Sequence, residues 1–93
     1  MADSKAPARS LTSELRIELI NEGFTLRDET STNFEYSSMN AEGESRTVYV
    51  DKEEKSVCLS EHDNAGRLTR ADKFPLRCRR DFEAVRTEVF ATI

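Results

Sequence analysis

The sequence is poor in the residues that build most catalytic and metal sites. It has one histidine, two cysteines, three glycines and no tryptophan among 93 residues. A zinc site needs about three or four Cys, His or carboxylate ligands, so Cys58, Cys78 and His62 are too few to form a recognised ligand pattern. The glycines stand apart at positions 23, 43 and 66, which excludes a glycine-rich phosphate loop. We therefore expect no metal, no cofactor and no enzymatic activity.

The few candidate nucleophiles and bases also have structural explanations. His62 lies between two acidic residues beside a predicted turn, where an exposed polar side chain is ordinary. Cys78 lies between two arginines that would favour a reactive thiolate if the side chain were exposed. It also falls on an apolar stripe with Phe82, so we predict that it packs in the core. Two cysteines do not indicate a disulfide framework.

Long apolar runs are absent as well. No stretch approaches the ~20 apolar residues that span a bilayer, and the first ten residues lack the apolar centre of a secretory signal. These features predict a cytoplasmic protein without membrane contact. Residues 1–9 are small and polar and include a proline, which predicts a disordered tail. The remaining residues, 10–93, suit one core and are expected to form a single domain.

The first periodic segment predicts a helix that begins near Ser10 or Thr12. Leucines at 11, 15 and 19 recur every four residues and make one apolar stripe. Gly23 and Phe24 then predict a Schellman ending, in which glycine takes a positive φ and the phenylalanine folds back onto Leu19.

After this helix the apolar period changes from four to two, which indicates strands. Alternating pairs occur at Phe24/Leu26, Phe34/Tyr36, Val48/Val50 and Val57/Leu59, and Leu68 marks one more short strand. Turn residues at 40–43, 51–55 and 63–66 separate them and suit hairpins. We therefore predict an antiparallel meander of three to five strands.

A second helix closes the chain. Cys78, Phe82, Val85 and Val89 form one stripe, with Pro75 just before the helix and Asp81 as a possible cap. The predicted fold is therefore α+β: an N-terminal helix, an antiparallel meander and a C-terminal helix. Both helices are expected on one face of the sheet.

Charge is unevenly distributed along the sequence. The chain has a formal net charge of −4, and residues 12–66 carry 13 acidic against 5 basic side chains, whereas residues 67–93 carry 7 basic against 4 acidic. A candidate site for anions or nucleic acid consists of the basic residues that lead into the second helix: Arg67, Arg70, Lys73, Arg77, Arg79 and Arg80. The alternative is that these side chains form internal ion pairs with the acidic segment.

Two features predict a surface for a protein partner. One is the set of acidic side chains in the hairpins: Glu42, Glu44, Glu53, Glu54, Glu61 and Asp63. They would suit a basic partner if they lie together, or they serve only solubility. The other is the solvent side of the sheet, where alternation predicts Asn33, Glu35, Thr47, Tyr49, Ser56 and Cys58. Tyr49 is the candidate anchor there, because tyrosine is favoured at interfaces.

The order helix, strands, helix, with Arg77, Arg79 and Arg80 at the start of the second helix, resembles double-stranded-RNA-binding domains. In that family a lysine-rich motif at this position contacts phosphates, and this chain lacks the family's glycine- and lysine-rich signature. The resemblance covers topology over about residues 10–92 and implies nucleic-acid binding.

The leading hypothesis is a small non-enzymatic protein–protein interaction module. It could serve as an inhibitor or adaptor, for example one encoded by a phage or mobile element. A homodimer formed through an exposed edge strand is one form of such binding. The alternative hypothesis is nucleic-acid binding through the basic start of the second helix.

Overall fold

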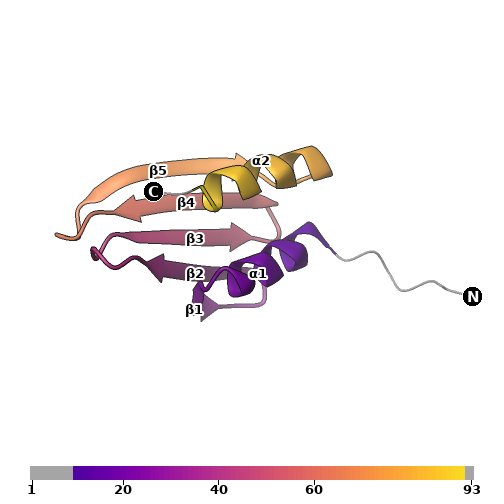
Figure 1. Cartoon of the computed structure of the whole chain (residues 1–93). Helices are drawn as coiled ribbons and strands as arrows, with labels where there is room; N and C mark the ends of the chain where they lie inside the picture. Colours follow the sequence, from indigo (N-terminus) through magenta and orange to yellow (C-terminus); the bar gives the residue numbers. More distant parts are fainter. Residues whose placement is uncertain (1–9, 92–93) are drawn as a thin grey trace, which may run out of the picture.

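The computed structural model describes residues 10–91, which form a five-stranded sheet and two helices (Figure 1). The elements in chain order are α1 (Leu11–Asn21), β1 (Thr25–Glu29), β2 (Asn33–Met39), β3 (Ser45–Asp51), β4 (Ser56–His62), β5 (Leu68–Pro75) and α2 (Arg79–Val89). The strands lie in chain order in the sheet, and each neighbouring pair is antiparallel. The predicted α+β meander between two helices is thus confirmed. The predicted tail, residues 1–9, lies outside the described residues.

Both ends of α1 follow from local side-chain chemistry. Ser10 is the N-cap, and its hydroxyl oxygen accepts the backbone N–H of Ser13 at 3.2 Å. At the other end the N–H of Phe24 donates to the carbonyl of Leu19 at 2.9 Å, and the N–H of Gly23 donates to Ile20 at 3.1 Å. These two bonds define a Schellman motif, and Gly23 has the φ of +90° that the motif requires. The predicted helix ending is confirmed.

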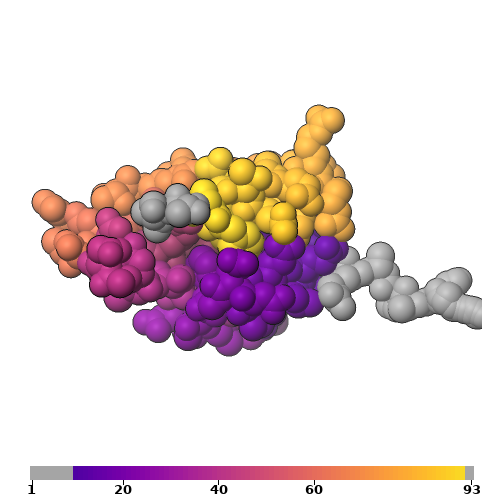
Figure 2. Space-filling view, in the orientation of Figure 1, coloured from indigo at the N-terminus to yellow at the C-terminus, as the bar shows by residue number. Residues whose placement is uncertain are grey.

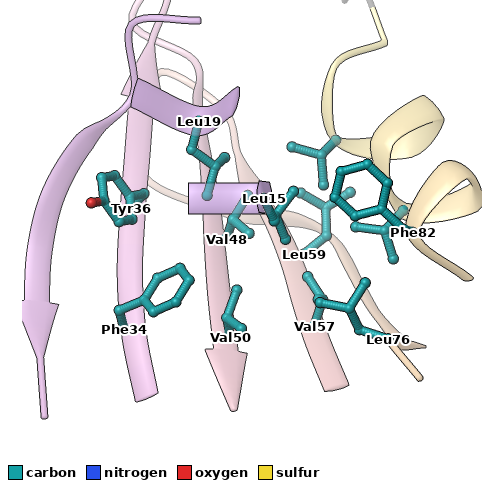
Figure 3. Close-up of a cluster of buried hydrophobic side chains, with 12 residues drawn as sticks. Leu15, Leu19, Phe34, Tyr36, Val48, Val50, Val57, Leu59, Leu76 and Phe82 are labelled. Atoms are coloured by element: carbon teal, nitrogen blue, oxygen red, sulfur yellow. The ribbon is translucent and has the colours of Figure 1, made fainter. Parts of the chain in front are cut away.

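The core lies between the helices and one face of the sheet. Direct cross-strand pairing places the apolar residues of the three central strands on one face, where they are almost fully buried: Phe34, Tyr36, Val48, Val50, Val57 and Leu59. Figure 3 shows these side chains pointing toward the helices, with Phe34 and Tyr36 at one side and Leu76 and Phe82 at the other. Burial of each such side chain contributes about 1.5–3 kcal/mol relative to an exposed one.

Residues of α1 and α2 belong to the same buried cluster. Leu15 and Leu19 of α1 and Phe82, Val85 and Val89 of α2 pack on the strand residues of that one face. Figure 1 shows both helices in front of the sheet, and Figure 2 shows their surfaces in contact along this side. Among the described residues no element remains to cover the opposite face, which we call the open face.

The start of α2 differs from the sequence prediction. Cys78 is exposed and is the N-cap of the helix, so the prediction that it packs in the core is wrong. The apolar stripe begins instead at Phe82, and Leu76 from the preceding loop fills the core with 2% of its surface exposed. The reason is the length of β5, because Pro75 ends that strand and three residues are needed to turn the chain into the helix.

Three strand predictions also need correction. Leu68 begins a strand of eight residues rather than a short one, and its side chain is largely exposed. Ser56, expected on the solvent side, is buried. In β1 the register shifts between Leu26 and Asp28, so Arg27 is an extra residue that perfect alternation did not predict.

Arg46 links the sheet to the end of α2. Its side chain is nearly buried, and one guanidinium nitrogen donates to the carbonyl oxygens of Val89 and Ala91, each at 2.7 Å. A second nitrogen donates to Glu61 on the neighbouring strand at 2.8 Å. A cation at this position satisfies carbonyls that the helix leaves free and opposes the negative end of its dipole.

Candidate functional site

The basic residues near α2 are largely engaged by acidic side chains of the same chain. Arg67 pairs with Asp63 at 2.9 Å, and Lys73 pairs with Glu54 at 3.2 Å. Arg70 contacts three carboxylates, those of Glu61, Asp72 and Glu88. The carboxylate of Asp72, followed by that of Glu88, raises the pKa of the Arg70 guanidinium above its usual value.

Two further ion pairs join the helices to each other. Arg79 donates two hydrogen bonds to the carboxylate of Glu14, and Arg86 donates to Glu18 at 2.6 Å. The Arg79 guanidinium also lies 5.0 Å from the ring centre of Phe82. Four of the six basic candidates, Arg67, Arg70, Lys73 and Arg79, are therefore engaged in ion pairs within the fold.

Arg77 and Arg80 are different, because their side chains form no ion pair with any of residues 10–91. Arg77 lines a hollow together with Lys52 and Lys55 from the turn between β3 and β4. In the sequence these two lysines belong to the turn at 51–55, which predicts a hairpin and does not by itself indicate a binding site. The fold brings them to Arg77 because the β3–β4 turn and the β5–α2 loop lie at the same end of the sheet.

The acidic candidates do not form one surface. Glu42 and Glu44 lie in the β2–β3 turn and Asp63 in the β4–β5 turn, and Glu44, Glu61 and Asp63 line one hollow. Glu53 and Glu54 lie in the β3–β4 turn, at the opposite ends of strands β3 and β4. An antiparallel meander places alternate turns at opposite ends, which the order of residues in the sequence does not show.

Several of these carboxylates are also occupied within the chain. Glu61 accepts from Arg46, and its side chain is only 20% exposed. Asp63 accepts the backbone N–H groups of Arg67 and Ala65, and these bonds hold the pKa of its carboxyl below the usual range. Such groups stabilise turns and strands rather than offering a free charge to a partner.

The open face carries a different set of groups. Cross-strand pairing places five of its side chains in one row across the sheet: Asp28, Glu35, Tyr49, Cys58 and Lys73. Tyr49 lies on the central strand, directly between Glu35 and Cys58. A neighbouring row consists of small residues, Thr25, Ser37, Thr47, Ser60 and Ala71. The result is a polar surface with the ring of Tyr49 on its central strand.

Two like charges stand directly opposite each other on this face. Asp28 of β1 is the cross-strand partner of Glu35 of β2, a geometry that puts their β-carbons roughly 5 Å apart. Neither carboxylate forms an ion pair with the described residues. At the far end of the row, Lys73 is neutralised by Glu54, whose carboxylate raises the pKa of the lysine. Sequence reasoning selected Tyr49 and Glu35 for this surface but missed Asp28, because the bulge at Arg27 hides its orientation.

The candidate catalytic residues His62 and Cys58 lie at separate places in the fold. Residues 10–91 contain no cluster of three or more His, Cys, Asp or Glu side chains that could hold a metal ion. His62 lies beside Glu61 and Asp63 in the hollow at the β4–β5 turn, whereas Cys58 lies on the open face. Neither helix of the described segment is long and apolar enough to cross a membrane.

No protein-family model, curated protein or solved structure matches this chain. The five strands also depart from the three-stranded order that the comparison with double-stranded-RNA-binding domains assumed. What the chain does must therefore be inferred from its own residues.

Proposed function

We propose that this chain is a non-enzymatic protein-binding module, an inhibitor or adaptor, that receives its partner on the open face of the sheet. The partner surface would present lysine or arginine side chains to Asp28 and Glu35, and an adjoining contact would cover Tyr49. This choice of chemistry follows from the charge of the face and from the absence of a helix over it.

The pairing of Asp28 with Glu35 is the observation that supports the proposal most strongly. Like charges directly opposite in a sheet destabilise it, and neither of these carboxylates has an ion-pair partner among the described residues. Arg27 lies next to Asp28 in the chain but forms no ion pair with either carboxylate. A cation of a partner would relieve this repulsion. The free energy that the repulsion costs the unbound fold would then be recovered on binding.

Tyr49 supports the same surface. It lies on the central strand between Glu35 and Cys58, and the neighbouring row consists of small side chains that leave room for a partner. Tyrosine supplies a large apolar area with few rotatable bonds and a hydroxyl that remains hydrogen-bonded at an interface.

The first experiment is a nuclear magnetic resonance titration of the full chain with an octalysine peptide, which is a minimal model of a cationic partner. We expect saturable shifts at the amides of Asp28, Glu35 and Tyr49. Shifts confined to the acidic turns around Glu44 and Asp63 would overturn the proposal, because the net negative charge would then explain the binding without the open face.

Matched variants extend the test to natural partners. The open-face variant combines Asp28→Asn, Glu35→Gln and Tyr49→Ala. The control variant makes the same kinds of change on the helices, with Glu22→Gln, Glu83→Gln and Ile20→Ala, all at exposed positions. A partner captured by the wild type and the control, in a salt-dependent manner, must be lost by the open-face variant. Equal capture by both variants contradicts the proposal.

Sedimentation equilibrium distinguishes a second copy from a different protein. If the wild type forms a dimer that the open-face variant does not, the face binds this same chain, and the proposed heterologous partner is wrong. A wild type that stays monomeric at about 0.1 mM agrees with a heterologous partner, because a dimer with a Kd in the micromolar range would be populated at that concentration.

Nucleic-acid binding through Arg77, Arg79 and Arg80 stays the alternative prediction. Arg79 is held by Glu14, whereas Arg77 and Arg80 are outside any described ion pair. Fluorescence anisotropy with short duplex RNA, duplex DNA and single strands at two salt concentrations tests it. Binding that falls steeply with salt and disappears when all three arginines are replaced by alanine would support this alternative.

A further inference from the structure

We propose that the hollow between the start of α1 and the β3–β4 turn binds the phosphate group of a small phosphorylated molecule, such as a nucleotide. The hollow has a volume of about 390 Å³. Its polar lining comes from three separate parts of the chain: Ser10 and Thr12, Lys52 and Lys55, and Arg77. This site is distinct from the open face, and its ligand is of a different class.

The charge of the lining carries the inference. Three cations line the hollow, and no carboxylate does. Five described lysines and arginines stand outside all ion pairs, namely Arg27, Lys52, Lys55, Arg77 and Arg80. Three of the five meet here. The other two, Arg27 and Arg80, do not line the hollow, so it gathers most of the unpaired positive charge of the described residues, which favours an anion.

Lys52 is flanked in the turn by Asp51 and Glu53, neither of which forms an ion pair with it, and it also lies near the carboxylate of Glu29. Its charge helps to hold the pKa of Glu29 below the usual range, but the main cause is the hydrogen bond from Arg16 to the same carboxylate. Glu29 is thus already paired at 2.6 Å, and Lys52 forms no ion pair with it. The lysine is therefore available to a ligand.

The first turn of α1 adds donors to the cations. The N–H of Ser13 is satisfied by the Ser10 hydroxyl and that of Glu14 by the Ser10 carbonyl. The N–H groups of Leu11 and Thr12 have no acceptor among the described residues. Free N–H groups at the start of an eleven-residue helix, together with its dipole, suit a phosphate oxygen.

Size and overall charge favour a small ligand over a nucleic acid. A volume of about 390 Å³ is in the range of small-molecule sites. The chain as a whole carries a net charge of −4, which repels a long polyanion beyond the hollow itself. A single phosphate or diphosphate meets three cations at short range and experiences less of the distant negative charge.

Lys55 offers a variant that separates binding from stability. It is the only residue other than glycine with positive φ in the described part of the chain, at +57°. Glycine adopts this conformation without strain, so Lys55→Gly should raise the denaturation midpoint of the protein. If Lys55 also binds phosphate, the same change must weaken binding.

The test is isothermal titration of the full chain with inorganic phosphate, pyrophosphate and ATP, followed by amide shift mapping. Pyrophosphate should bind saturably and shift the amides of Leu11, Thr12, Lys55 and Arg77. Lys52→Gln and Arg77→Gln should each weaken the affinity for pyrophosphate by about tenfold, as expected for loss of a charge-assisted hydrogen bond. The matched controls Arg27→Gln and Arg80→Gln remove unpaired arginines outside the hollow and should leave affinity unchanged.

Three outcomes overturn the proposal. No saturable binding by the wild type excludes the site. Equal loss in the hollow variants and the controls shows a general charge effect. Duplex RNA that binds more tightly than pyrophosphate and depends on Arg80 as much as on Arg77 shows a nucleic-acid surface rather than a small-ligand site. Neither of the proposed sites uses a residue of the other, so failure here leaves the protein-binding proposal untouched.

Discussion

The guanidinium of Arg46 donates a hydrogen bond to the carbonyl oxygen of Val89, 43 positions later in the chain, at 2.7 Å. The same group binds Ala91 and Glu61, so a single side chain holds the end of α2 against β3 and β4. Arginine is suited to this task because its planar fork can satisfy several acceptors in fixed directions.

Removal of Arg46 should therefore be costly. We expect Arg46→Ala to lower the free energy of unfolding by about 3 kcal/mol, since it leaves Glu61 and two carbonyl oxygens without their donor in a nearly buried position. Urea denaturation followed by circular dichroism measures the loss. A cost below about 1 kcal/mol would mean that water replaces the arginine easily. Arg27→Ala, at an exposed position, is the matched control.

Gly23 should be sensitive to substitution for conformational reasons alone. Its φ is +90°, and an added β-carbon would meet no atom within 4 Å. We expect Gly23→Ala to reduce stability by about 1 kcal/mol, with a smaller loss for Gly23→Asn, because asparagine tolerates the left-handed region better. The denaturation midpoints of the two variants test this order. Equal midpoints for Gly23→Ala and Gly23→Asn would contradict the conformational explanation.

Phe82 and Cys78 test the corrected beginning of α2. Phe82 is 2% exposed, so Phe82→Ala should cost about 3 kcal/mol or more. Cys78 is exposed and makes no capping bond from its side chain, so Cys78→Ser should be neutral or slightly stabilising, because serine caps helices well. If Cys78→Ser proved strongly destabilising, the cysteine would belong to the core after all.

Asp63 should contribute to the dependence of stability on pH. Hydrogen bonds from the N–H groups of Arg67 and Ala65 lower the pKa of this carboxyl in the folded state. The contribution of Asp63 to the free energy of unfolding is therefore complete above the pKa of about 4 that the carboxyl has in the unfolded chain. It is lost as the pH falls through the lowered pKa of the folded state. Asp63→Asn keeps an acceptor oxygen but cannot ionise, so unfolding curves from pH 6 to pH 2 should show a shallower decline. An unchanged slope would argue against this assignment.

Glu35 should limit stability while serving the proposed interface. Relief of the repulsion with Asp28 predicts that Glu35→Gln raises the free energy of unfolding by about 0.3 kcal/mol. The same change at low ionic strength should have a larger effect, because salt screens exposed charges. Thermal denaturation at two salt concentrations provides the measurement, and Glu53→Gln, in an exposed turn, is the control. A destabilised Glu35→Gln variant would show that the pair has a compensating contact.

Local features of the chain were readable without the structure. The i, i+4 leucines and the Gly23–Phe24 ending define α1, and the alternation of Phe34/Tyr36, Val48/Val50 and Val57/Leu59 defines three central strands. These signals depend on residues a few positions apart, whose geometry is fixed by helix and strand periods. Predictions from the same periods were wrong where the chain is irregular, at the bulge of Arg27 and at the exposed N-cap Cys78.

The sequence by itself thus determined the order of elements, most of the residues that face the core and the lack of a recognisable metal-ligand pattern. Only the tertiary structure decided which charges meet. It matched Arg67, Arg70, Lys73 and Arg79 with carboxylates, divided the acidic turns between opposite ends of the sheet, and left Lys52, Lys55 and Arg77 together around one hollow. The physical reason is that helix and strand periodicity relates residues only a few positions apart. Charge pairing instead depends on the distance through space, and the antiparallel strands set that distance between residues far apart in the chain.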